Sequence, residues 1–146
     1  MSRAQCIVVR GRKVLMVKHR LGGQEYWCLP GGRVEPGESP AEASLRELQE
    51  ECNVRGKIIL ETSIANYPEK HYSFLIDIGD QEPYIGSDPE LDDKDQIMQE
   101  VKWMSLGEIT ERDRVYLWSA GLLCVNRFLT EIESWGDEIS YPQGIL

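Results

Sequence analysis

The segment from Gly32 to Val54, GRVEPGESPAEASLRELQEECNV, constrains the fold most because it carries a full set of helix signals. Ser39 is a preferred N-cap, and Glu42, three residues later, completes a capping box with it. Apolar residues then recur at steps of four, three and four residues, which predicts one buried stripe. Asn53 tolerates the left-handed conformation that often ends a helix. We therefore expect a helix that begins after Ser39 and ends near Asn53.

Three carboxylates crowd one flank of this predicted helix. Glu47, Glu50 and Glu51 are spaced by three and four residues, so their side chains are neighbours on one face. They occupy the last turns, where the helix dipole disfavours negative charge. Arg46 is the only basic residue between positions 38 and 54. A solvated acidic face is one interpretation. The other is a site for a hard cation, because carboxylate oxygens suit Mg²⁺, Mn²⁺ or Ca²⁺.

The same segment resembles the Nudix box, G-x5-E-x7-R-E-U-x-E-E-x-G-U, in which U is apolar. All defined positions match except one, where Asn53 replaces the usual glycine. Both residue types can end a helix in the left-handed region. The flanking segments 27–32 (WCLPGG) and 100–103 (EVKW) also resemble the family's approach to the box and a late strand. The matching positions of the box are Gly32, Glu38, Arg46, Glu47, Leu48, Glu50, Glu51 and Val54.

The resemblance implies a metal site and a reaction. It implies that Glu47, Glu50 and Glu51 ligate Mg²⁺, with Mn²⁺ as an alternative, and that the main-chain carbonyl of Gly31 is a further ligand. The implied reaction is attack by water on a phosphorus atom of a diphosphate linkage. That chemistry requires neutralisation of charge on the phosphate oxygens and an activated water.

Catalytic roles follow from the same resemblance. Glu50 is the first candidate for the general base, and Glu100 is the candidate outside the box. Arg46 is expected to pair with carboxylates of the box and to fix their positions, because a guanidinium can bind them as a fork.

Candidate substrate-binding residues are Arg20, Gly32 and Glu38. Arg20, with Lys18 and His19 as alternatives, could contact phosphate because arginine binds phosphate with two hydrogen bonds. Glycines at 31 and 32 would let the backbone approach the metal and phosphates closely. Glu38 is expected in the loop before the helix, where it would act on the site through neighbouring groups.

The substrate is left open by the sequence. Pro68 lies about where members that cleave ADP-ribose carry a proline, and Tyr72 lies about where dinucleoside-polyphosphate members carry a tyrosine. Trp27, Tyr67 and Tyr72 could each stack on a base, although aromatic residues more often pack in cores. The first hypothesis is hydrolysis of a nucleoside diphosphate linked to another group, such as ADP-ribose. The alternatives are a nucleoside triphosphate pyrophosphatase and a catalytically silent nucleotide-binding module.

We expect residues 1–146 to form a single α/β domain with the α/β/α sandwich around a mixed β-sheet that the resemblance implies. A hairpin is predicted at Gly11-Arg12, and residues 21–25 are expected to form a flexible loop. The apolar tail, 135–146, is expected to pack on the domain or on a partner such as a second copy. The other predicted elements are strands at 4–10, 13–20, 26–29, 57–67, 71–78 and 97–104, and helices at 105–109 and 116–128.

Composition narrows the classes of partner. The net charge of −9 argues against binding long nucleic acids, but a small phosphorylated substrate is compatible with it because metal ions reverse the local field. No apolar run is long enough to span a membrane, and the N-terminus does not resemble a signal peptide, so a cytoplasmic location is expected. The four cysteines contain no CxxC pair, which argues against a zinc site or a disulfide framework.

Overall fold

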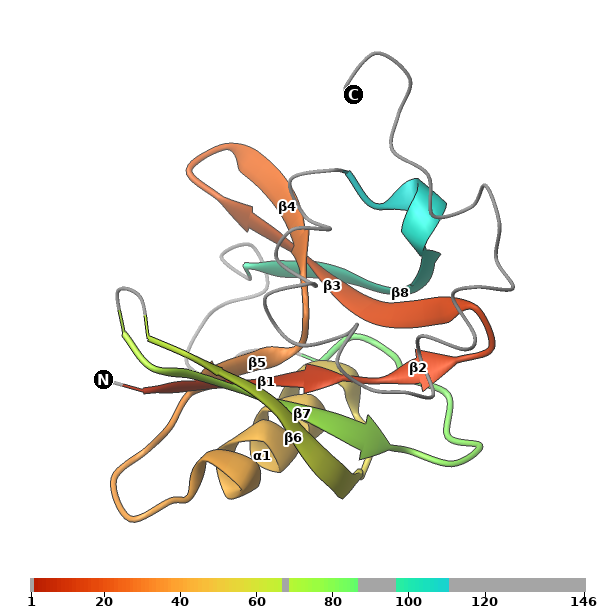
Figure 1. Cartoon of the computed structure of the whole chain (residues 1–146). Helices are drawn as coiled ribbons and strands as arrows, with labels where there is room; N and C mark the ends of the chain where they lie inside the picture. The colour runs from red at the N-terminus through yellow and green to blue at the C-terminus, as the bar shows by residue number, and fades with distance from the viewer. Residues whose placement is uncertain (1, 67–68, 87–96, 111–146) are drawn as a thin grey trace, which may run out of the picture.

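The computed structural model describes residues 2–66, 69–86 and 97–110. Figure 1 shows the elements of the chain, coloured from red at the N-terminus towards blue at the C-terminus. They are β1 (Arg3–Ile7), β2 (Val9–Arg10), β3 (Lys13–Leu21), β4 (Gln24–Cys28), β5 (Gly31–Arg33), α1 (Pro40–Cys52), β6 (Lys57–Ala65), β7 (His71–Asp77), β8 (Met98–Ser105) and a short 3-10 helix, η2 (Leu106–Glu108).

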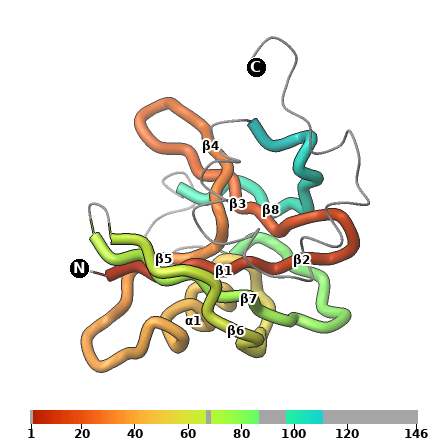
Figure 2. The backbone as a smooth tube through the Cα atoms, in the orientation of Figure 1, coloured from red at the N-terminus to blue at the C-terminus, as the bar shows by residue number. Residues whose placement is uncertain are grey.

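These strands form two sheets with α1 on the outer side of one of them. The first sheet has the order β5-β1-β7-β6, and the second has the order β2-β3-β4 with β8 paired to β3. In the first sheet β1 runs parallel to β7 and antiparallel to β5, so the sheet is mixed, as predicted. Figure 2 shows α1 on one side of the first sheet and the second sheet on the other.

Helix α1 confirms the boundaries predicted from its capping residues. The Glu42 backbone N–H donates to Ser39 Oγ at 3.1 Å, and the Ser39 N–H donates to Glu42 Oε1 at 3.2 Å. At the other end Asn53 is left-handed, with φ 57° and ψ 34°, and its N–H donates to the Gln49 carbonyl at 3.0 Å. Asn53 therefore fulfils the helix-ending role that glycine has in the box.

The apolar stripe of α1 is buried against the first sheet. The cluster that contains it draws on β1, β7 and the helix, so local periodicity and long-range packing agree. Cys6, Cys28 and Cys52 are free, in keeping with the absence of a disulfide framework among the described cysteines. The buried cluster includes Ala4, Cys6, Val8, Leu15, Val17, Ala43, Leu48, Cys52, Val54, Phe74, Ile76 and Ile78.

Two predictions near the N-terminus are wrong in an instructive way. The expected strand at 4–10 is divided at Val8, so that β1 joins the first sheet and β2 joins the second. The expected flexible loop at 21–25 is mostly strand, because only Gly22 and Gly23 separate β3 from β4. Both glycines have positive φ (61° and 79°), which suits a two-residue hairpin turn.

Most of the remaining elements agree with the sequence predictions. The hairpin at Gly11-Arg12 joins β2 to β3, and β6 pairs antiparallel with β7. The predicted strand at 97–104 is β8, and the short helix after Ser105 is the 3-10 helix η2. The predicted helix at 116–128 and the tail at 135–146 lie outside the described residues.

No helix in the portion of the chain that the structure describes is long and apolar enough to cross a bilayer.

The capping box gives a stability prediction for α1. Replacing Ser39 by Ala removes the acceptor of the Glu42 N–H, so we expect the free energy of unfolding to fall by about 1 kcal/mol. Urea denaturation measures the change. Ser39→Asp keeps an acceptor at this position and should lose much less. Equal losses in the two variants would contradict the assigned cap.

Candidate active site

The Gly31-Gly32 strand lies directly against the acidic flank of α1. The Gly31 N–H donates to Glu51 Oε1 at 2.7 Å. A Cβ atom on Gly32 would collide with the Glu47 carboxylate, and one on Gly31 would collide with the Ala4 carbonyl oxygen. Glycine at position 31 therefore lets β5 lie close against β1, and glycine at position 32 leaves room for the Glu47 carboxylate in its present place.

Arg46 connects four separate acceptors at this site. Its Nε and Nη2 donate to the two oxygens of Glu38 at 2.8 and 3.0 Å. Its Nη1 donates to Glu47 Oε1 at 2.9 Å and to Glu50 Oε2 at 3.3 Å, and Nη2 also reaches the Arg33 carbonyl at 2.9 Å. These contacts with carboxylates are the ones predicted for Arg46. They tie the loop before the helix to the acidic flank.

Glu51 joins the two sheets. Its side chain is 7% exposed, and Oε2 lies 3.5 Å from His19 Nε2, which comes from β3 of the second sheet. His19 Nε2 is a buried nitrogen that has no hydrogen-bond partner in the described part of the chain. The His19 ring packs edge-on against Tyr26 on β4, with ring centroids 5.6 Å apart. The Glu51 carboxylate of α1 therefore contacts both sheets, through Gly31 of the first and His19 of the second.

The carboxylates oppose one another electrostatically. Burial, followed by the negative charge of Glu51, raises the pKa of Glu47 above its usual value, while Arg46 acts in the opposite direction. Burial and the nearby carboxylates Glu51 and Glu47 also raise the pKa of the Cys6 thiol. A negative potential therefore extends from the acidic flank into the core beneath it.

This donor set fits a divalent cation. Glu47, Glu50 and Glu51 present carboxylate oxygens, which Mg²⁺ and Mn²⁺ prefer. Burial and the charge of Glu51 raise the pKa of Glu47 even though Arg46 pairs with it. Among residues 2–66, 69–86 and 97–110, no three His, Cys, Asp or Glu side chains are arranged so that they could hold a metal ion together. Arg46 instead binds Glu47 and Glu50.

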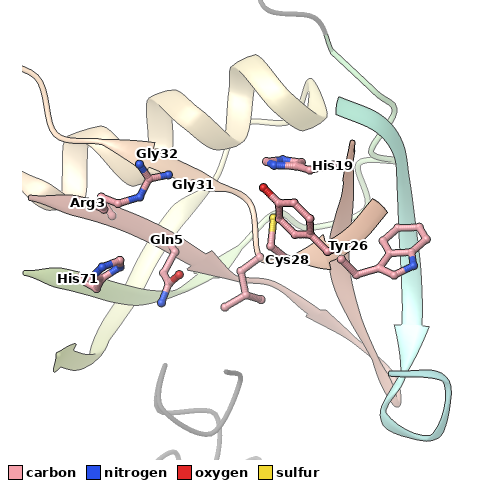
Figure 3. A pocket seen from close by; sticks show the side chains of 11 residues that line it. Arg3, Gln5, His19, Tyr26, Cys28, Gly31, Gly32 and His71 are labelled. Carbon is pink, nitrogen blue, oxygen red and sulfur yellow. The ribbon is translucent and has the colours of Figure 1, made fainter. Parts of the chain in front are cut away.

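A cavity of about 390 Å³ adjoins this flank. Figure 3 shows residues from β1 and β7 at one end of it and His19 and Tyr26 at the other. Its volume lies in the range of small-molecule sites. The lining residues are Arg3, Ala4, Gln5, His19, Tyr26, Trp27, Cys28, Leu29, Gly31, Gly32 and His71.

Other predicted site residues lie apart from the cavity lining. Arg20 is 56% exposed and lies 3.6 Å from Glu25. Glu100 on β8 lies 4.0 Å from Lys18 Nζ. Glu38 lies in the loop before α1, as predicted, and contacts Arg46. The roles of these residues in substrate binding and catalysis stay predictions.

Sequence reasoning missed several residues of the cavity. Arg3 and Gln5 reach it because β1 pairs in parallel with β7, a contact between segments almost 70 residues apart that no local pattern predicts. Tyr26 reaches it because β3 and β4 form a hairpin. The Gly22-Gly23 pair was the available signal for that hairpin.

Taken together, the fold and site define an α/β protein in which a helix-borne acidic flank faces a glycine strand and a small-molecule cavity. The NUDIX domain family matches residues 1–124. The chain belongs to the Nudix family, and its fold is the Nudix-type α/β/α sandwich.

Individual proteins agree with this assignment. The chain is 40% identical over 57 residues to 8-oxo-dGTP diphosphatase of Proteus vulgaris, covering 38% of this chain and 49% of the relative. It is 35% identical over 79 residues to diphosphoinositol polyphosphate phosphohydrolase 3-beta of Homo sapiens, covering 51% and 48%. The chain thus spans about half the length of these curated relatives. The MutT NUDIX hydrolase from Burkholderia pseudomallei has the same fold, with TM-score 0.60, 20% identity and coverage of 81% and 95%.

The raised pKa of Glu47 gives a prediction about stability without metal. The pKa of this carboxyl is higher in the folded state than in the unfolded state. The free energy of unfolding therefore falls as the pH rises from the unfolded-state pKa through the folded-state pKa. Glu47→Gln should therefore raise the melting temperature at neutral pH in EDTA by a few degrees. The gain should vanish below the ordinary glutamate pKa of 4.5.

Calorimetry with added Mg²⁺ completes that experiment. Mg²⁺ should raise the melting temperature of the wild type, because a ligand stabilises the state that binds it. Most of this increase should be lost in Glu47→Gln. Glu61→Gln on the exposed side of β6 is the matched control and should behave as wild type. A lower melting temperature for Glu47→Gln in EDTA at neutral pH would contradict the strained carboxylate.

Proposed function

We propose that this chain is a pyrophosphohydrolase, dependent on a divalent metal ion, that cleaves the diphosphate linkage of a nucleoside diphosphate joined to another group, for example ADP-ribose. The observation that carries the proposal is the buried contact of Glu47 and Glu51 with the Gly31-Gly32 strand beside a cavity. Carboxylates crowded at one place, with Arg46 as their paired cation, suit a site for a metal ion and a polyphosphate.

In the proposed reaction, water attacks one phosphorus of the linkage. The bond between that phosphorus and the bridging oxygen breaks, which gives a nucleoside monophosphate and a second phosphorylated fragment. Glu50 is our candidate to take the proton of the attacking water, because its side chain is 48% exposed and therefore accessible. Bound Mg²⁺, held by Glu47, Glu50 and Glu51, would supply charge neutralisation at the phosphate oxygens.

The other residues of the site have supporting roles in this proposal. Arg46 holds Glu47 and Glu50 at the flank and anchors them to Glu38. His19 and Tyr26 give the cavity an aromatic wall against which a flat ring could pack. An open pocket of about 710 Å³ lies beside Glu50 and offers room for the group on the other side of the linkage.

A nucleoside triphosphate pyrophosphatase is the second candidate. It is favoured by the similarity to a Proteus vulgaris protein named as an 8-oxo-dGTP diphosphatase. Its products would be a nucleoside monophosphate and pyrophosphate. A silent nucleotide-binding module is a weaker alternative, because a module without chemistry has no need of three crowded carboxylates.

The expected partners follow the same argument. The net charge of −9 supports a small phosphorylated substrate over a long nucleic acid. Mg²⁺ is the proposed metal, with Mn²⁺ as a substitute. A cytoplasmic location, the absence of a membrane partner and a homodimer stay predictions from the sequence.

A substrate panel tests the proposed function. With Mg²⁺, the protein should release products from ADP-ribose or from a nucleoside triphosphate. Glu50→Gln should lower kcat by roughly 10²- to 10⁴-fold, because it removes a general base. Glu61→Gln, an exposed carboxylate on β6, should retain full turnover. The proposal that the chain is an enzyme would be contradicted if the protein bound nucleotides without metal and turned over no substrate of the panel.

A further inference from the structure

A row of basic side chains crosses the first sheet near the cavity. Arg3 on β1 is directly opposite Arg33 on β5 and His71 on β7 in the strand registers. Directly opposed residues project from the same face of a sheet, with neighbouring strands about 4.8 Å apart. Arg33, Arg3 and His71 therefore form a row, which we call the basic row.

No carboxylate in the described part of the chain forms an ion pair with the basic row. Elsewhere the arginines Arg10 and Arg46 are paired with glutamates. Across the described ranges, by contrast, none of Arg33, Arg3 and His71 forms an ion pair. Like charges directly opposite on neighbouring strands are destabilising. Arg3 and Arg33 are thus like-charged neighbours on one face of the sheet, an arrangement that a bound anion would stabilise.

The position of the row relates it to the proposed active site. Arg3 and His71 line the cavity, whereas Arg33 is exposed at its edge. In Figure 3 Arg3 and His71 lie at the end of the cavity opposite His19 and Tyr26. Gln5 and Gly31 form the neighbouring row on the same face, about 7 Å away at the rise of a β-strand. The Gly31 N–H donates to Glu51, so the row of Gln5 and Gly31 touches the acidic flank. The basic row is the next row of the sheet.

The geometry points to a second anion site. We propose that the basic row binds an anionic substituent of the substrate, a phosphate or a carboxylate, that is separate from the diphosphate linkage that is cleaved. The inference rests on the proposed function and refines it: the preferred substrates are diphosphates in which one moiety carries a further acidic group.

The donors of the row suit such a group. Arg3 presents a planar fork that can bind two oxygens of a phosphate or carboxylate, and His71 adds a ring N–H from the adjacent strand. Gln5, beside the row, donates from its side-chain amide to Ser73 Oγ at 2.9 Å, which fixes the direction of that side chain. The acidic flank would repel the same anion, so the anionic group and the metal would bind at different places.

Binding of a small anion without metal tests this inference independently of catalysis. The chain has two histidines, so its imidazole NMR signals can be assigned with His71→Gln. In EDTA at constant pH and ionic strength, inorganic phosphate should shift the His71 signals saturably and leave those of His19 nearly unchanged. Acetate in a parallel titration shows whether a carboxylate is accepted as well.

Variants provide the controls for that titration. Arg3→Gln should weaken the phosphate affinity by roughly ten- to hundredfold, the usual effect of losing a charge-assisted contact. Arg55→Gln removes the same charge at an exposed position between α1 and β6, outside the cavity lining, and should leave the affinity unchanged. Absence of a saturable shift at His71, or equal affinity in Arg3→Gln and wild type, would overturn the proposal, whether or not the protein hydrolyses nucleotides.

A pair of substrates locates the anion relative to the cleaved linkage. We compare kcat/KM for ADP-ribose and for ADP-ribose with one additional phosphate on the 2′ oxygen. Arg3→Gln should reduce the preference for the additional phosphate by about tenfold, and Arg55→Gln should not change it. An equal loss on both substrates would assign the basic row to the reacting diphosphate and contradict a separate subsite.

Discussion

The Arg46 guanidinium is the interaction on which the acidic flank depends. Its donors reach Glu38, Glu47, Glu50 and the Arg33 carbonyl, so one side chain connects the strand before the loop, the loop itself and the helix. Without it, the like charges near the C-terminal end of α1 would repel one another with no nearby cation. A lysine could not replace these contacts, because a single ammonium lacks the planar fork.

The rest of the site is assembled by long-range pairing around this helix. β5 brings Gly31 and Gly32 against the carboxylates, and the second sheet brings His19 within 3.5 Å of Glu51. The cavity lies where the two sheets meet. The acidic flank and the basic row, which have opposite charges, consequently lie close to each other in space. Arg3 and its neighbours in the row follow the flank. A polyphosphate with bound cations suits the acidic flank, and an anion without a cation suits the basic row.

Sequence alone predicted what depends on neighbouring residues. The helix and its caps at Ser39 and Asn53 follow from spacing within one segment, and the structure confirms them. The pairing of Arg46 with carboxylates of the box was an expectation from the family resemblance, and these contacts are present as well. The division of the first strand at Val8 was not predictable, because an apolar run does not show which sheet each half joins. The same limit explains why Arg3 was missed, because its pairing with His71 joins segments that are far apart in the sequence.

The central claim is that crowded carboxylates on one helix tolerate one another because they serve a divalent cation bound to a polyphosphate. A crystal structure with Mg²⁺ and an ADP-ribose analogue with a methylene-bridged diphosphate tests it most directly. Our account predicts metal density between the analogue's phosphate oxygens and the side chains of Glu47, Glu50 and Glu51. Metal and phosphates bound away from α1, with Arg46 still occupying those carboxylates, would contradict it.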